Sequence, residues 1–379
     1  MPELPEPSGL GRRLLVVALV GLLGLACERD RPNQDDQPKS TPASVPADQE
    51  ALVGHTFLRL RDAQDIPEVF VERQRLELAL DQRGNYYLGV GPRVLAYDRG
   101  AAKPYLRVIE LPGPMTLLGV HRDRLILFGD DPSGCASEPC TSVFGLATSG
   151  EGAVERIAAL EVESDPVLVG DQVAGLGQGA LVHVSLTSGE VRRTSFAGTE
   201  ALGELAVRRD ELIWAGRREH ALVLRSKAPF STLEVAAELE ASADRALIIR
   251  VAWAGDGIVY LVSELVTELE GDERRPTLYR KSGDTTQTLL SEVSAAATLI
   301  NDTQSAWLAD RGKLWRIDDA LHSIAAHTKL QFLTGTPAGL AWAQHEDDTL
   351  SFLLSGEAPS GFAPLESQAL IANLPARRD

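Results

Sequence analysis

The sequence predicts an all-β protein, a β-propeller of seven blades that each contain four antiparallel strands. Three observations predict it: a polar turn followed by an apolar strand recurs seven times after residue 52, a Ser-Gly turn or a looser version of it follows each of them, and few segments have helical periodicity. A repeat of about 40 to 45 residues with four short strands is typical of propeller blades. Rings of six or eight blades remain alternatives.

Residues 1–26 have the pattern of an export signal. Arg12 and Arg13 precede an apolar run of 13 residues at positions 14–26. A helix needs about 20 residues to span a bilayer, so this run is too short for an ordinary membrane span. We therefore expect the chain to be exported.

Cys27 directly follows the small residue Ala26 at the end of this run, which resembles the lipobox of bacterial lipoproteins. The resemblance implies that Cys27 is diacylated and becomes the mature N-terminus, and Glu28 in the next place implies sorting to the outer membrane. The charged residues 28–31 argue against Cys27 lying inside an anchor helix. Plain secretion and an uncleaved anchor are the alternatives.

Residues 27–51 are predicted to form a disordered tether, because they include four prolines and many polar side chains but almost nothing to bury. A random coil of this length reaches roughly 25 to 30 Å. Residues 52–379 are expected to form the propeller. A single core stops growing at roughly 250 to 300 residues, but a ring of repeats avoids this limit because each unit packs against its neighbours.

The first landmark of each repeat is a polar turn that opens the second strand, and it recurs in steps of 35 to 48 residues. Two and four places after each turn, twelve of fourteen residues are apolar, and this spacing puts them on one face of a strand. Trp214, Trp307 and Trp342 share one of these places, which predicts packing between blades rather than a ligand cage. The turn positions are Gly84, Asp123, Asp171, Asp210, Asp256, Thr303 and Ala338.

The turns place the first strands of the blades just before them, and two surplus strands at residues 55–60 and 69–72 could pair with the last unit and close the ring. Two Ala/Glu-rich segments, 235–244 and 291–298, are interpreted as strand ends that run into loops, with a short helix as the alternative for either. The first strands are expected at residues 76–80, 116–120, 166–170, 202–207, 247–253, 297–300 and 330–333.

The second landmark is a Ser-Gly-Glu/Asp turn, in which Gly supplies the positive φ of a tight hairpin. Together the two landmarks resemble the quinoprotein-like and WD40-like propeller blades of exported bacterial proteins, in which such a turn joins the third strand to the fourth. Residues 170–196 match this pattern most clearly. The strict turns begin at Ser149, Ser188, Ser282 and Ser355.

Two loops between second and third strands are longer than the others, since the offset from the first landmark to the second is 26 residues in units two and five but 17 in units three and seven. They span residues 130–141 and 264–276 and should emerge on one face of the ring, which makes them candidate partner-binding loops. Their candidate residues are Asp130, Asp131, Glu138 (which follows Ser137), Glu264, Glu268, Glu270, Asp272, Glu273, Arg274 and Arg275.

Cys135 and Cys140 lie inside the first of these loops, and in an exported chain this pair predicts a local disulfide. A redox-active pair would have the C-x-x-C spacing instead. The formal net charge of −17 makes nucleic acid an unlikely class of partner, because phosphate backbones would be repelled.

Signals for catalysis, cofactors and metals are weak. The sequence lacks the G-x-S-x-G, H-E-x-x-H, P-loop and EF-hand motifs, and its seven histidines have no metal-ligand spacing. The closely spaced glycines at 175–179 are not followed by a helix that could bind phosphate. Asp130-Asp131 and residues 345–348 offer oxygen ligands for Ca²⁺, but solvated hairpin turns account for both. Quinoprotein blades carry a tryptophan where this chain has Phe196. We therefore expect no cofactor, no metal and no catalytic residue.

The functional prediction is an exported, lipid-anchored propeller that acts as a non-catalytic binding or scaffold module for a protein or small-molecule partner at the cell envelope. One alternative is a propeller enzyme, such as a hydrolase, lyase or quinoprotein-like dehydrogenase, with its site in the central channel. A second resembles the propeller lipoprotein of the outer-membrane β-barrel assembly machinery. An enzyme should present charged or histidine side chains from several blades at the channel mouth.

Overall fold

A computed structural model describes the chain in the ranges 50–61, 76–98, 105–131, 141–196, 198–242, 246–264, 276–302, 304–325, 330–336, 338–346, 349–356 and 364–367. All described residues belong to the compact unit Ala47–Asp379. Within the described ranges the secondary structure consists of strands, and no helix there is long and apolar enough to cross a membrane.

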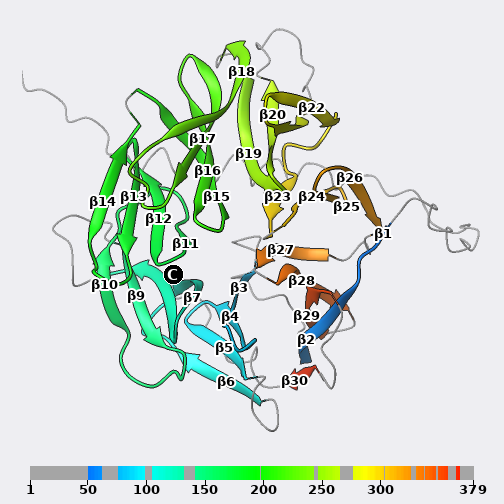
Figure 1. Ribbon diagram of the computed structural model, residues 1–379. Coiled ribbons are helices and arrows are strands. Elements are labelled where there is room, and N and C mark those ends of the chain that lie inside the picture. The colour runs from blue at the N-terminus through cyan, green and yellow to red at the C-terminus, as the bar shows by residue number, and fades with distance from the viewer. Residues whose placement is uncertain are drawn as a thin grey trace, which may run out of the picture. The chain divides into compact units, whose positions relative to one another are not determined.

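The strands form seven sheets around a common axis, which is a β-propeller with seven blades, as the sequence predicts (Figure 1). Consecutive strands pair antiparallel within each blade, and the first strand of each blade is innermost. Blade 1 contains β3 (Glu77–Leu80), β4 (Tyr86–Val90), β5 (Arg93–Asp98) and β6 (Tyr105–Glu110). Blade 2 contains β7 (Met115–His121), β8 (Arg124–Asp130), β9 (Thr141–Ala147) and β10 (Glu155–Ala159). Blade 3 contains β11 (Val167–Val169), β12 (Gln172–Gly177), β13 (Ala180–Ser185) and β14 (Val191–Ser195).

The remaining blades follow the same order around the ring. Blade 4 contains β15 (Glu200–Arg208), β16 (Glu211–Arg217), β17 (His220–Lys227) and β18 (Glu234–Ser242). Blade 5 contains β19 (Ala246–Ala254), β20 (Gly257–Glu264), β21 (Thr277–Ser282) and β22 (Thr285–Leu290). Blade 6 contains β23 (Thr298–Asn301), β24 (Ala306–Asp310), β25 (Lys313–Ile317) and β26 (Leu321–Ala325). Blade 7 contains β27 (Leu330–Thr336), β28 (Gly339–Glu346) and β29 (Thr349–Ser355), and takes its fourth strand from the N-terminal part of the chain.

The N-terminal strand β2 (Gly54–Arg61) closes the ring as the fourth strand of blade 7, pairing antiparallel with β29. The prediction of a closing strand at residues 55–60 is therefore confirmed, whereas the one at 69–72 lies outside the described residues. Two short strands extend the neighbouring edges: β1 (Glu50–Ala51) pairs parallel with β26, and β30 (Leu365–Ser367) pairs parallel with β2.

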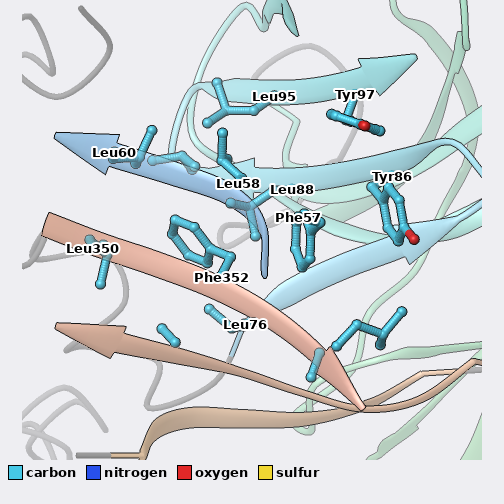
Figure 2. Close-up of a cluster of buried hydrophobic side chains, with 14 residues drawn as sticks. Phe57, Leu58, Leu60, Leu76, Tyr86, Leu88, Leu95, Tyr97, Leu350 and Phe352 are labelled. Atoms are coloured by element: carbon cyan, nitrogen blue, oxygen red, sulfur yellow. The ribbon is translucent and has the colours of Figure 1, made fainter. Parts of the chain in front are cut away.

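A hydrophobic cluster joins the closing blade 7 to blade 1 (Figure 2). A β-bulge between Thr56 and Leu58 lets two successive residues, Phe57 and Leu58, both be buried, at 1% and 2% exposure. The Phe57 ring stacks on Tyr86 of β4 with centroids 4.9 Å apart. At the start of β2 the backbone passes so close to Trp342 that a Cβ at Gly54 would collide with the indole ring. Ring closure thus depends on the packing of one strand from each end of the chain.

Polar side chains of the innermost strands join blades to one another. The Glu77 carboxylate accepts a hydrogen bond from the backbone N–H of Leu117 in blade 2, at 2.9 Å. The Arg208 guanidinium donates to the Gly255 carbonyl of blade 5 and lies 3.9 Å above the centroid of the Trp253 ring. In blade 6 the Asn301 amide donates across to the Val207 carbonyl of blade 4, at 2.7 Å. These hydrogen bonds fix the side chains of Glu77, Arg208 and Asn301 to the backbone of other blades.

Both Ala/Glu-rich segments follow the strand interpretation. Residues 234–242 form β18, and the segment at 291–298 consists of turns that lead into β23. The three aligned tryptophans are buried between blades, as predicted: Trp214 in the cluster between blades 3 and 4, and Trp307 and Trp342 in the cluster between blades 6 and 7.

Candidate functional site

A polar cleft lies between blades 3 and 4. The antiparallel register of blade 3 alternates side chains between its two faces. On the face towards blade 4, the residues near the β12–β13 turn, including Leu176 and Leu181, are apolar and pack with Trp214. Towards the turn from third to fourth strand the same face becomes polar, and the blades separate.

Two adjoining cavities form this cleft, an inner one of about 160 Å³ and an outer one of about 530 Å³. They adjoin at His183, Arg192 and Pro229, which line both. The inner cavity is also lined by Gln172, Ser185, Ser188 and Glu190, and the outer one by Arg193, Thr194, Ser195 and Ser231. We call this set of residues the blade 3–4 cleft.

His183 is the buried polar residue of the cleft, with 4% exposure. Its Nδ1 lies 2.6 Å from the Gln172 side-chain oxygen, and because an amide oxygen only accepts hydrogen bonds, this places the ring proton on Nδ1. Burial lowers the pKa of His183, the charge of Arg192 lowers it further, and Glu190 opposes these effects in part. The neutral ring therefore keeps its Nε2 lone pair as an acceptor for a ligand.

Glu190 and Arg192 form the mouth of the inner cavity. The Arg192 guanidinium donates two hydrogen bonds to the Glu190 carboxylate, at 2.8 and 2.9 Å. This bidentate contact lowers the pKa of the Glu190 carboxyl, chiefly through the hydrogen bond from Arg192. The hairpin turn before them is fixed by the backbone N–H of Ser185, which donates to the Glu190 carbonyl at 3.0 Å. The pair is exposed but oriented, with further guanidinium N–H groups left to donate.

The opposite wall comes from the loop that joins β17 to β18 in blade 4. Phe230 is fully buried there, adopts a positive φ of 60°, and packs edge-on against the His183 ring at 5.4 Å between centroids. The Thr194 hydroxyl donates to the Phe230 carbonyl at 2.5 Å, and the Ser226 hydroxyl donates to the Thr232 carbonyl at 2.7 Å. Contacts from both blades therefore hold the wall in place.

The chemistry of the cleft suits reversible binding of a polar group. His183 bonds Gln172, while the hydroxyl oxygens of Ser185 and Ser188 accept backbone N–H groups at 3.3 Å. A serine nucleophile would need a hydrogen bond to the histidine base, and neither of these serines has one. Within the described ranges, no group of three or more His, Cys, Asp and Glu is placed to hold a metal ion.

The strand ends that carry the candidate loop of blade 2, Asp130 of β8 and Thr141 of β9, lie on the ring face opposite the Ser188–Glu190 turn of the cleft. Asp130 is exposed at the end of β8. Asp131 is buried at 4% exposure, accepting from the Ser142 hydroxyl at 2.9 Å and pairing with Arg156 at 2.5 Å, so it fixes the base of its loop to β9 and β10.

The other predicted positions are only partly covered. Glu264 ends β20, and its side chain lies outside the described residues. The same holds for the lipidation residue, the cysteine pair and the remaining loop residues, so their roles stay predictions. These residues are Cys27, Cys135, Cys140, Glu138, Glu268, Glu270, Asp272, Glu273, Arg274 and Arg275.

The sequence analysis did not predict the blade 3–4 cleft. One signal was present: Gln172, His183, Ser185, Glu190 and Arg192 put polar side chains on three neighbouring strands and the turn between two of them, where a face buried between blades should be apolar. A polar stripe on such a face indicates either a hydrogen-bonded network or an opening between blades.

Neither the protein-family models nor the curated proteins contain a match to this sequence. Among solved structures, YCF48 bound to a D1 peptide is similar with a TM-score of 0.50 and 12% identity, over 82% of this chain and 100% of that one. PorZ, a surface component of the type-IX secretion system of Porphyromonas gingivalis, gives 0.48 and 10% over 81% of this chain. This chain spans 39% of the length of PorZ.

The propeller domain of the trilobed protease from Pyrococcus furiosus gives a TM-score of 0.48 and 10% identity, over 75% of this chain and 93% of that one. At such low identities similarity concerns the fold alone. With the strand order of its own sheets, this chain is a seven-bladed β-propeller whose fourth strand in the last blade comes from its N-terminal part.

Proposed function

We propose that this chain is an exported, lipid-anchored β-propeller that binds a partner at the cell envelope without catalysing a reaction on it. The blade 3–4 cleft carries this proposal, because it combines fixed walls, a neutral buried histidine and an oriented Arg–Glu pair but no activated nucleophile. Such a site offers hydrogen bonds at low ordering cost, which is what reversible recognition requires.

Three polar side chains of the innermost strands serve the frame, while Glu204 on β15 is exposed and Arg250 on β19 is half-buried. A catalytic channel needs charged side chains from several blades that are free to meet a substrate. Here Glu77, Arg208 and Asn301 each hydrogen-bond the backbone of another blade. The hydrogen bonds of these three side chains hold neighbouring parts of the ring together.

A peptide segment is the class of partner that the cleft fits best. The outer cavity runs along β14 and is large enough for a few side chains, while the inner cavity accommodates one small polar group. YCF48, similar in fold, is bound to a D1 peptide in its solved structure. The long loops of blades 2 and 5 offer a second contact on the opposite ring face.

The proposed cellular location of the protein rests on its first residues. A short apolar run that ends at Ala26-Cys27, followed by Glu28 and a proline-rich polar segment, supports lipidation of Cys27 and sorting to the outer membrane. The acyl chains would hold the propeller near the membrane surface through the tether at residues 27–51, which leaves both ring faces accessible.

Affinity capture tests the binding role. The full chain and three variants are recovered from detergent-solubilised membranes of the source cell: a chain with residues 264–276 cut to a two-residue turn, Arg192→Ala, and the control Arg225→Ala, which removes another exposed Arg–Glu pair in blade 4. We expect recovery of a discrete partner to fall at least about fivefold in Arg192→Ala and to stay unchanged in the control. Equal recovery from all four proteins would contradict a role for both the cleft and the loop.

A further inference from the structure

The outer strand β14 of blade 3 forms one wall of the blade 3–4 cleft and is also the edge of its sheet. Four consecutive residues of β14, from Arg192 to Ser195, line the outer cavity. Neighbouring side chains on a strand point to opposite faces, so four in a row can line one hollow only where it also reaches the backbone edge. The sheet order ends at β14, and none of the described strands pairs with that edge.

Hydrogen bonds at both ends of β14 show which of its backbone groups face outwards. The N–H of Ser185 donates to the Glu190 carbonyl, and the N–H of Phe196 donates to the Gly179 carbonyl, both at 3.0 Å. Opposed residues of an antiparallel pair alternate between bonded and non-bonded, and the register between β13 and β14 is unbroken. Every second residue of β14 therefore has its N–H and C=O at the open edge. These residues are Val191, Arg193 and Ser195.

Two other blades of this molecule carry a fifth strand at the same place. The strand β1 pairs with the outer edge of β26 in blade 6, and β30 pairs with that of β2 in blade 7. Among the outer strands without such a partner, β10, β18 and β22 each have a register shift against their neighbour, which bends a strand. The strands β6 and β14 are regular, and of these two β14 borders the cleft. The edge of blade 3 is therefore suited to an added strand.

Both arginines of β14 are paired with a carboxylate. Arg192 pairs with Glu190 at 2.8 Å, and Arg193 pairs with Glu161 at 3.2 Å. Charged side chains protect an edge strand against indiscriminate pairing. Because the charges on this edge are matched locally, a neutral segment can pair with β14 without displacing them.

The buried end of the cleft selects the side chain that such a segment can insert. His183 is 4% exposed and lines both cavities, and its Nε2 has no partner among the described residues. A neutral imidazole nitrogen needs a proton from the ligand. A carboxylate lacks this proton and would meet the Glu190 carboxylate, while an ammonium would be repelled by the two arginines. A primary amide has two donors and an acceptor, which match His183 Nε2, the Glu190 carboxylate and the Ser185 hydroxyl.

We propose that the peptide bound by the blade 3–4 cleft pairs with β14 as a fifth strand of blade 3 and places a glutamine amide against His183. This proposal rests on the binding function proposed for the cleft. A residue beside Arg192 in the added strand points to the same face as Arg192 and His183, at two strand spacings, or roughly 9 to 10 Å, from His183. Glutamine suits this distance, because its side chain is longer than that of asparagine.

Surface plasmon resonance on the immobilised full chain in non-ionic detergent tests the proposal. The probe is acetyl-Thr-Val-Gln-Val-Thr-amide, an uncharged peptide of strand-forming residues with one glutamine. We expect saturable binding with a dissociation constant below about 5 mM. Probes with glutamic acid or leucine in place of the glutamine should bind at least about tenfold more weakly. Absence of binding, or equal binding of the three probes, would overturn the proposal.

Proline substitutions test the strand pairing, because proline has no N–H and is tolerated on an edge strand where the N–H faces outwards. Arg193→Pro should bind the probe at least about tenfold more weakly than Arg193→Ala, which loses the same side chain but keeps the N–H. Val191→Pro removes another outward N–H and replaces Arg193→Pro if urea titration shows that variant to be unfolded. The control Val108→Pro removes an outward N–H from the regular edge strand β6 of blade 1 and should bind as the wild type does.

Failure of strand pairing can be told apart from failure of the cleft as a binding site. If probe binding is lost in Arg192→Ala but is equal in Arg193→Pro and Arg193→Ala, the cleft binds a peptide without an added strand, and the proposal is refuted. Equal weakening by Arg193→Pro and Val108→Pro would also refute it. Capture of a partner through the cleft, with no binding of the probe, would leave the proposed binding function intact and overturn only the pairing with β14.

Discussion

Removing the Phe57 side chain should open the ring at its closure. The ring of Phe57 is 1% exposed, stacks on Tyr86 at 4.9 Å and lies 6.3 Å from the Phe352 ring between centroids. Truncation of a buried phenylalanine to alanine costs about 3–5 kcal/mol, and the lost aromatic pairing places Phe57→Ala near the upper part of that range. A domain is stable by only about 5–15 kcal/mol in total, so this loss is a large part of the margin.

Urea unfolding measures this effect through the transition midpoint. Val53→Ala, one residue before β2 and 57% exposed, serves as the control and should change stability by less than about 0.5 kcal/mol. If Phe57→Ala loses less than about 1 kcal/mol while the slope of the transition stays unchanged, β2 does not close blade 7 as described. Limited proteolysis of the variant should release the N-terminal segment before the blades are cut.

Three further outcomes are expected. Asn301→Ala removes the hydrogen bond to the Val207 carbonyl and should lower the free energy of unfolding by about 1–3 kcal/mol. The control Gln304→Ala, at an exposed turn, should lower it by less than about 0.5 kcal/mol. Equal losses would refute the cross-blade contact. The pKa of His183 is lowered in the folded chain, so as pH falls through the ordinary value of 6.5 the unfolded chain binds this proton first and the folded state loses stability. His183→Gln should therefore lose less stability than wild type between neutral and mildly acidic pH. Identical pH profiles of unfolding for the two proteins would contradict this. Metabolic labelling with palmitate should mark the wild type but not Cys27→Ser, and a labelled variant would end the lipoprotein proposal.

The blade repeats were predictable because each blade imposes its own local pattern. A turn at Asp210 followed by apolar Leu212 and Trp214 two and four places on predicts a strand with one buried face, and β16 has this arrangement with both side chains fully buried. The closing strand was visible as a surplus strand near the N-terminus. Residues 235–244 had an ambiguous composition; those up to Ser242 belong to β18, where Ala237 is buried and pairs with Val223 of β17.

Contacts between blades were not predictable from local patterns. The bond from Asn301 to Val207 joins residues 94 positions apart, and β1 and β30 are too short to produce a periodic signal. The cleft depends on a loop of blade 4, held by Phe230, lying against the polar end of blade 3. Its residues belong to ordinary hairpins in the sequence, and only the tertiary packing makes them one site.

Site-specific photocross-linking in the source cell tests the binding role most directly. A photoreactive side chain is placed at Ser231 in the cleft, at Asp130 on the face of the long loops, and at Ala320 in the exposed turn between β25 and β26 as a control. We expect a discrete adduct with one partner from Ser231, a weaker or equal one from Asp130, and none from Ala320. Adducts of equal yield from Ala320, or none from either Ser231 or Asp130, would contradict a propeller that binds its partner through these surfaces.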